Sequence, residues 1–348
     1  MAESILKTSF EIAGRQIGGG APCFVIAEAG VAHFGSLDIA RSLVDMAAEA
    51  KADAVKFQVF KTERLVSAEA PEWVARLRPK ELPFSAFEEI KRYAESMGIL
   101  FLATAHEEYS ADFLQELNIP AFKVGSGEVN NLPFLRHLAR KGKPLLISTG
   151  LHDDSAIQGI LDVCSSEGCE ELALLHCVTA YPTPYDEANL RAIPAMQQRY
   201  GVPVGYSDHT VGTEVPLAAV ALGAVIIEKH ICLDKSTAGS QDCRVACDRT
   251  DLRTLVVQAR HVEAALGSGI KTVAESAKGS LVWARKSLVA RRQLKAGHQL
   301  ASDDVVVKRP GTGIRPDEME RAVGKILVRT LEPDEVIRWE HLKPDETA

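Results

Sequence analysis

Two histidines, His209 and His230, stand at the ends of two successive short apolar runs, which begin at Val202 and Ala224. On neighbouring parallel strands their imidazoles would lie side by side, as two nitrogens must to share one metal ion. A lone strand-end histidine more often only makes a hydrogen bond, so the prediction depends on the pair. Because other strong ligands are not evident, open positions remain for water and substrate oxygens. This favours Mn²⁺ or Mg²⁺ acting as a Lewis acid over a closed zinc site.

Two lysines, Lys56 and Lys123, occupy corresponding positions in two other apolar runs, and several hydroxyl side chains stand at similar places. Two cations, short hydroxyls and the glycine-rich GSG and STG segments are what a phosphate or phosphate-plus-carboxylate ligand requires. Two alternatives are a buried ion pair and, for Lys56, a Schiff base of a class I aldolase; the histidine pair favours metal activation. The hydroxyls of this predicted anion site belong to Thr104, Ser126, Ser148 and Ser207.

Two carboxylates are candidates for proton transfer or for holding substrate hydroxyls. Glu28 ends the first apolar run, and Glu128 follows the GSG segment. Either residue could instead only neutralise the lysines. Asp208, next to His209, could orient the imidazole or cap a loop.

The elements that must position these residues are short apolar runs that alternate with amphipathic segments. Residues 36–52, 85–98 and 251–267 carry apolar side chains at helical spacing, which predicts helices with one buried face. Eight strand–helix pairs in about 250 residues favour a (β/α)8 TIM barrel over an open doubly wound sheet, with the polar strand ends meeting at one mouth. The runs are FVIAEAG, AVKFQVF, ILFLATA, AFKVGSG, PLLISTG, LALLHCV, VPVGYSD and AVIIEKH.

The rest of the chain predicts three further parts. TSFEIAGRQIGGG alternates like a hairpin and is expected to close the bottom of the barrel, so that residues 1–266 form the first domain. Residues 267–283 are rich in small and turn-forming residues and predict a linker. Residues 284–348 carry short β-branched runs between Gly and Pro and predict a small, β-rich domain.

Composition narrows the class of protein. Lys and Arg number 40 against 47 Asp and Glu, a net charge of −7, which argues against nucleic acid or an anionic membrane as a partner. The longest apolar stretch, residues 215–227, is too short to span a bilayer. Seven scattered cysteines predict free thiols rather than a disulfide framework or structural zinc, and the start has no export signal. We therefore expect a cytoplasmic protein.

Taken together, the motifs resemble the sialic acid synthase family, which includes the N-acetylneuraminate, legionaminate and pseudaminate synthases. The resemblance spans essentially the whole chain, and the tail is similar to the family's SAF domain, related to type III antifreeze protein. It implies an enzyme, a transferase that condenses phosphoenolpyruvate with an N-acetylated amino sugar aldehyde. The products are a nine-carbon 2-keto-3-deoxy acid and phosphate, formed by C–O cleavage. The matching segments are FVIAEAGVAHFGS, DAVKFQ, AFKVGSGEVNNLP, KPLLISTG, LLHCVTAYPTPYDEANL, GYSDHTVGTEVPLAAVALGAVIIEKH and VVVKRPGTGI.

The resemblance also implies roles for individual residues. Glu28 would handle the attacking water, and His209 and His230 would bind the metal that polarises the aldehyde. In the family the small domain caps the partner's active site in a swapped homodimer, from which Arg309 would reach the sugar. The residues implied to hold phosphoenolpyruvate are Lys56, Thr104, Lys123, Ser126, Ser148 and Ser207; those implied to contact the sugar are Gln58, Glu128, Tyr181, Asp242 and Arg309.

The sequence departs from the family pattern on the acceptor side. The usual N-H-N-G is replaced by residues 32–35, AHFG, and the usual T-P-F-D by residues 104–107, TAHE. Thr179 and Ala180 stand where an Asn is common, and Cys243 and Arg244 replace His-Lys. This predicts unchanged chemistry on a different sugar, such as a 2,4-diacetamido-trideoxy hexose instead of N-acetylmannosamine. Two other functions stay open: a metal-dependent pyruvate aldolase and a non-catalytic sugar-binding protein.

Overall fold

The computed structural model describes residues 5–237 and 240–344. The chain divides into two compact units, residues 1–267 and 268–348. In the first unit, eight parallel strands close into a barrel in the order β10-β3-β4-β5-β6-β7-β8-β9, which confirms the predicted TIM barrel. The strands are β3 (Phe24–Gly30), β4 (Ala54–Val59), β5 (Leu100–Ala105), β6 (Phe122–Val124), β7 (Leu145–Ser148), β8 (Leu172–His176), β9 (Val204–Asp208) and β10 (Ile226–His230).

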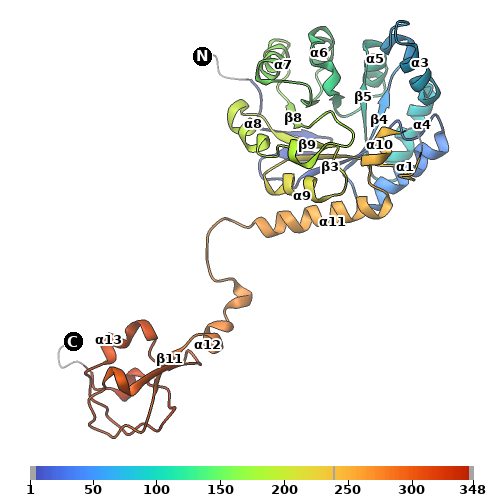
Figure 1. Ribbon diagram of the computed structural model, residues 1–348. Helices are drawn as coiled ribbons and strands as arrows, with labels where there is room; N and C mark the ends of the chain where they lie inside the picture. Colours follow the sequence, from blue (N-terminus) through green and yellow to red (C-terminus); the bar gives the residue numbers. More distant parts are fainter. Residues whose placement is uncertain (1–4, 238–239, 345–348) are drawn as a thin grey trace. The chain divides into compact units, whose positions relative to one another are not determined.

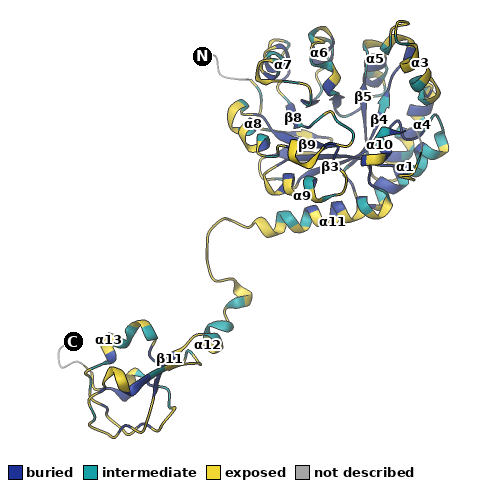
Figure 2. Ribbon diagram, in the orientation of Figure 1, coloured by how far each residue is buried: buried dark blue, intermediate teal, exposed yellow. Residues whose placement is uncertain are grey.

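Helices surround the barrel, and each of the longer ones, such as α1 and α11, buries one face, as Figures 1 and 2 show. The three segments predicted as amphipathic helices form α1 (Leu37–Glu49), α4 (Phe84–Ser96) and α11 (Arg249–Leu266). None of the helices among the described residues is long and apolar enough to cross a membrane. The others in this unit are α2 (Thr62–Leu65), α3 (Pro71–Leu77), α5 (Glu108–Glu116), α6 (Leu132–Ala139), α7 (Asp154–Ser166), α8 (Ala192–Tyr200), α9 (Glu214–Ala221) and α10 (Gln241–Val245).

Alternation along each strand divides its side chains between two environments. In β3, Val25 and Ala27 join the apolar layer under the helices, whereas Phe24 and Ile26 join the smaller cluster inside the barrel. One step further on the inward face stands Glu28. The inward set therefore changes from apolar at the bottom of the barrel to polar at the carboxyl ends of the strands, where TIM barrels carry their sites.

The predicted N-terminal hairpin is present and lies under the barrel. Strands β1 (Ser9–Ile12) and β2 (Arg15–Gly18) pair antiparallel, with Phe10 opposite Ile17. The side chains of Phe10, Ile12 and Ile17 belong to the same buried cluster as the inward-facing side chains at the bottom of the barrel strands. The hairpin thus closes the bottom and leaves the mouth as the open end.

The second unit has a core of its own, which includes Leu288 and Ile337. Strands β11 (Ser287–Ala290) and β12 (Val305–Lys308) pair antiparallel, as their β-branched runs predict. The runs KILVRT and EVIRW contribute only isolated bridges, at Ile326 and Leu327 in the first run and at Val336 in the second. The unit also contains α12 (Ser280–Ala284), which crosses the end of the predicted linker at residue 283, and α13 (Met319–Ala322).

Candidate active site

A cavity of about 190 Å³ opens at the carboxyl ends of the barrel strands. It brings together eleven of the residues singled out from the sequence, although they come from segments up to 200 residues apart. The residues that line it are Glu28, Lys56, Gln58, Thr104, His106, Lys123, Gly125, Ser126, Gly127, Ser148, Thr179, Tyr181, Ser207, His209, Glu228 and His230.

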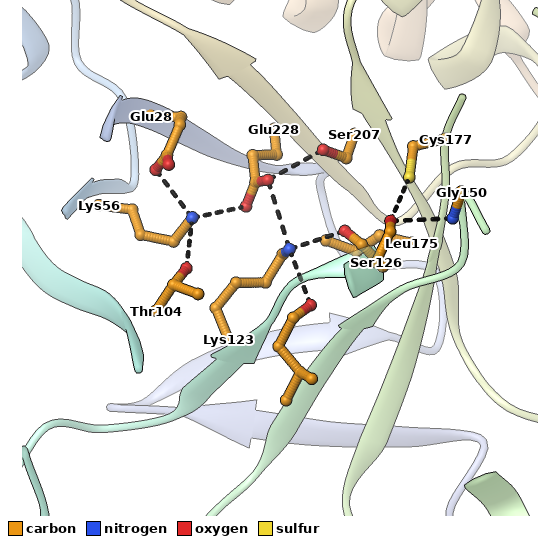
Figure 3. A network of polar contacts seen from close by, with 12 residues as sticks. Glu28, Lys56, Thr104, Lys123, Ser126, Gly150, Leu175, Cys177, Ser207 and Glu228 are labelled. Atoms are coloured by element: carbon orange, nitrogen blue, oxygen red, sulfur yellow. Dashed lines mark hydrogen bonds and ion pairs between the residues drawn. The ribbon is translucent and has the colours of Figure 1, made fainter. Parts of the chain in front are cut away.

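Lys56 is held between two carboxylates deep in this cavity (Figure 3). Its ammonium nitrogen lies 2.8 Å from a carboxylate oxygen of Glu28 and 3.6 Å from one of Glu228. It also donates a hydrogen bond of 2.8 Å to the hydroxyl of Thr104. Lys56 and both carboxylates are almost fully buried, so water screens these ion pairs little.

Lys123 approaches Glu228 from the other side. Its nitrogen lies 3.5 Å from the second oxygen of Glu228 and donates hydrogen bonds to the Ser148 hydroxyl at 2.7 Å and to the Val124 carbonyl. The hydroxyl of Ser207 donates to the same Glu228 oxygen at 2.9 Å. Glu228 is therefore a bridge between the two lysines of the predicted anion site, as Figure 3 shows.

Burial and charge act against each other on these groups. Burial lowers the pKa of Lys56, but Glu228 and Glu28 outweigh it and the net shift is upward. Burial dominates at Lys123, where Glu228 opposes and Lys56 reinforces it, and lowers that pKa. Burial raises the pKa of Glu228, but Lys123 and Lys56 bring it down to about 2. Since a Schiff-base lysine must lose its proton easily, the raised pKa of Lys56 argues against the class I aldolase.

His209, directly after β9, and His230, at the end of the neighbouring β10, lie side by side with ring centroids 5.5 Å apart. Nδ1 of His209 lies 2.7 Å from the Val178 carbonyl oxygen, which can only accept, so Nδ1 carries the proton. Burial and His230 lower the pKa of His209 to about 3. The ring is therefore neutral at pH 7, and its Nε2 lone pair accepts a 3.0 Å hydrogen bond from the Tyr181 hydroxyl.

This arrangement fits a divalent metal ion. A metal-binding histidine typically donates its second ring nitrogen to a carbonyl or carboxylate, as His209 does to Val178. The part of the chain that the structure describes holds no group of three or more His, Cys, Asp or Glu suited to a metal. The two histidines would thus supply two nitrogen ligands and leave the other positions to water and substrate.

Glu28 lies at the wall of the cavity next to Gln58. The amide of Gln58 donates a 3.2 Å hydrogen bond to one Glu28 oxygen, while Lys56 holds the other. Both side chains therefore have a fixed orientation, with Gln58 the more exposed of the two.

Three predicted sugar-binding residues do not line the cavity. Glu128 belongs to the turn after β6 and accepts a hydrogen bond from Asn131, and Asp242 lies in α10. Arg309 belongs to the second unit, where its guanidinium lies 5.4 Å from the ring centre of Trp283.

Asp208 does not contact the His209 ring. It accepts hydrogen bonds from the backbone and hydroxyl of Thr210, so the loop-capping alternative describes it better than imidazole orientation. It also forms a buried ion pair of 2.5 Å with Lys229, its register partner on β10. The carbonyl of Val178 takes the orienting role instead.

Two cavity residues received no role from the sequence, Glu228 and His106. A signal was present for both: Glu228 stands two residues before His230 and His106 two residues after Thr104, so each shares the inward face of its strand. What could not be seen from the sequence is that Glu228 reaches both lysines, because those lie on strands far from β10 in the chain.

Comparisons with known proteins identify the family of the chain. Residues 43–271 match the NeuB family, and residues 285–343 match the SAF domain, as the sequence predicts. The N,N'-diacetyllegionaminic acid synthase of Legionella pneumophila is 39% identical, over 92% of this chain and 95% of its own length. The human N-acetylneuraminate-9-phosphate synthase is 36% identical over 94% of both chains.

Solved structures show the same relationship. A crystal structure of N-acetylneuraminic acid (sialic acid) synthetase from Leptospira borgpetersenii serovar Hardjo-bovis, in complex with citrate, matches with a TM-score of 0.74 and 34% identity. The match covers 78% of this chain and 95% of that one. The first unit of the present chain is a TIM barrel and the second a SAF domain, and the chain belongs to the NeuB family.

Proposed function

We propose that this protein condenses phosphoenolpyruvate with an N-acetylated amino sugar aldehyde, giving a nine-carbon 2-keto-3-deoxy acid and inorganic phosphate. The observation that carries the proposal is that one cavity is lined by two buried lysines, four hydroxyl residues and two histidines. The first set suits an anionic donor, and the second suits a metal-assisted electrophile. The relatives named N,N'-diacetyllegionaminic acid synthase and N-acetylneuraminate-9-phosphate synthase support the proposal.

The donor would lie against Lys56 and Lys123. These lysines carry positive charge close to the hydroxyls of Thr104 and Ser148, with Ser126 and Ser207 also at the wall. Glu228 compensates part of that charge when the cavity is empty, so the lysines are held in place before the donor arrives. Such preorganisation limits the free energy lost in ordering the site on binding.

In the proposed reaction, C3 of phosphoenolpyruvate attacks the aldehyde carbon and forms the new C–C bond, while the aldehyde oxygen gains a proton. Water then adds to C2, and the C2–O bond breaks to release phosphate. Glu28, fixed by Gln58 and Lys56, would hold or take the proton of this water. A divalent metal ion, Mn²⁺ or Mg²⁺, bound at His209 and His230 would supply Lewis-acid polarisation of the aldehyde oxygen.

The acceptor would lie toward the mouth, near Gln58 and Tyr181. Thr179 lines the cavity where the family often has an Asn, and it is one of several departures on this side. Because the donor and metal residues are present and the acceptor residues differ, we favour a 2,4-diacetamido-trideoxy hexose over N-acetylmannosamine. The relative from Legionella pneumophila, named for a diacetyl product, supports this choice.

Three residues outside the cavity complete the proposal. We assign Glu128, Asp242 and Arg309 to the sugar, the last from the SAF domain of a second copy in a swapped homodimer. Mixing two inactive variants, Lys123→Met and Arg309→Ala, tests this arrangement, because heterodimers would regain one intact site. Failure to regain activity with both variants folded would contradict the swap.

The experiment that tests the function measures phosphate release from phosphoenolpyruvate, with a keto-deoxy acid assay, for N-acetylmannosamine, its 6-phosphate and 2,4-diacetamido-trideoxy mannose. We expect release with the diacetamido sugar that requires Mn²⁺ or Mg²⁺ and stops with a chelator. Lys123→Met should abolish it, whereas Lys51→Met, an exposed lysine at the other end of the barrel, should not. Product from pyruvate without phosphate release would instead indicate the aldolase.

A further inference from the structure

The inner wall of the cavity contains one imidazole, His106, that the proposed reaction does not use. His106 follows β5 and shares the inward face of that strand with Thr104, one step closer to the mouth. Its ring packs edge-on against Phe60, with centroids 6.2 Å apart. Within the described residues the ring nitrogens make no hydrogen bond, so both remain available to a ligand.

The position of the ring favours contact with the phosphoryl end of phosphoenolpyruvate over contact with its carboxylate end. A Cβ atom placed on Gly125 would lie 4.0 Å from Cε1 of His106, so the ring borders the turn that carries Ser126. The hydroxyls of Thr104 and Ser148 each meet a lysine nitrogen in this same sector of the barrel, β4 to β7. This sector is rich in hydrogen-bond donors. A phosphoryl group, whose three terminal oxygens all accept hydrogen bonds, fits it better than a carboxylate does.

The surroundings of His106 explain its protonation state. Burial, then Lys56 on β4 and Lys123 on β6, lower its pKa to about 4. The ring is therefore neutral near pH 7, and one N–H can donate while adding no further positive charge beside the two lysines. A phosphoryl dianion bound there would counter the lysines and stabilise the protonated ring.

We propose that His106 is a donor-binding residue that contacts the phosphoryl group of phosphoenolpyruvate. The proposal rests on the function given above and adds a residue to its donor site. At this position the family usually carries Pro-Phe in place of Ala105-His106, so the contact would be a property of this chain.

The test is the affinity for three probes, measured by calorimetry without acceptor: phosphoenolpyruvate, inorganic phosphate and pyruvate. His106→Phe keeps a ring against Phe60 but removes the N–H that donates the hydrogen bond. We expect the Kd of phosphoenolpyruvate and of inorganic phosphate to rise about tenfold. The Kd of pyruvate, which has no phosphoryl group, should change less than twofold. His106→Gln, which restores a donor, should recover part of the loss.

Two controls separate this contact from general damage and from a wrong function. His261→Phe makes the same change on the exposed face of α11 and should leave every Kd unchanged, and melting temperatures verify folding. An equal loss of pyruvate affinity, or a change confined to the KM of the sugar, would overturn the assignment. If the unaltered protein binds neither phosphoenolpyruvate nor phosphate, the proposed function itself fails.

A second readout is the pH dependence of donor binding. Because a bound phosphoryl group favours the protonated ring, the affinity of the unaltered protein should increase relative to His106→Gln as the pH falls from 7 to 6. A constant ratio between the two proteins would show that the ring takes up no proton on binding, which would overturn protonation of the ring by the bound phosphoryl group but not the contact through its neutral N–H.

Discussion

Replacing Lys229 by Met should destabilise the barrel because it isolates a buried charge. Lys229 and Asp208 are 1% and 0% exposed, and their side chains meet at 2.5 Å between β9 and β10. Lys229 also donates to the Thr210 carbonyl at 2.6 Å. Removing the lysine leaves Asp208 with hydrogen bonds from Thr210 and Tyr206 but without its buried cationic partner.

The expected loss follows from these contacts. Breaking a buried ion pair by removing one partner costs about 3 to 5 kcal/mol, and the remaining Thr210 hydrogen bonds place this case near about 3 kcal/mol. At about 2 °C per kcal/mol for a unit of this size, Tm should fall by about 6 °C. Removing both charges, in Lys229→Met with Asp208→Leu, should recover most of the loss, because no unpaired charge remains.

The assay is urea unfolding followed by circular dichroism, with thermal melts alongside. Arg260→Met is the matched control: it also breaks an ion pair, with Asp53 at 3.0 Å, but the arginine is 35% exposed and Asp53 keeps Arg15 as a partner. We expect a loss of about 1 kcal/mol or less there. A loss below about 1 kcal/mol for Lys229→Met, or a double variant as unstable as the single one, would refute the reasoning.

Three further predictions concern the charges of the cavity and of the SAF domain. Glu228→Gln should lower the affinity for phosphoenolpyruvate, measured without metal, less than tenfold but reduce kcat more than tenfold. The reason is that Lys56 and Lys123 lose the carboxylate that positions them. An unchanged kcat would contradict this role. Burial lowers the pKa of Lys123, so this lysine should lose its charge at a pH below 10.5, the ordinary lysine value. The affinity for phosphoenolpyruvate should therefore already decrease as the pH rises toward 10.5, and fluorescence titrations at several pH values check the direction. In the SAF domain, burial raises the pKa of Asp304, but His298, the Ala301 amide and Arg292 outweigh it and bring it to about 2. This depressed pKa stabilises the folded state above about pH 4 and the contribution is lost as the pH falls toward 2. Asp304→Asn should therefore reduce stability at pH 7 and have little effect near pH 2; an equal loss at both pH values would mean that the charge is not responsible.

The fold could be predicted because its signal is local and repeated. Each barrel strand is a short apolar run, and helices such as α1 and α11 show their buried face in the spacing of residues like Leu43 and Leu255. The SAF domain was harder in detail. Its later runs form single bridges instead of strands, since turns rather than extended pairing shape a small unit.

The site could be predicted as a set of residue types but not as a network. A polar residue at the inward end of a strand identified Lys56, Lys123 and His209, since barrel topology brings such ends together. The same rule covers Glu228, and His106 directly after β5, but no motif in the sequence assigned either of them a role. For Asp208, sequence reasoning left two alternatives, orienting the imidazole or capping a loop. Only the contacts of Asp208 with Thr210 and Lys229 distinguish them.

The sequence by itself determined the barrel, a separate small C-terminal domain and the chemical types at the mouth, because strand and helix periodicity and strand-end polarity depend on residues close together in the chain. The tertiary structure decided which charges are paired and in what state they stand. Glu228 lies between Lys56 and Lys123, and the Val178 carbonyl fixes the proton of His209, only because closing the barrel brings distant strands within a few ångströms in a cavity with little water. Such contacts depend on distance and burial, and neither is written in the spacing of residues along the chain.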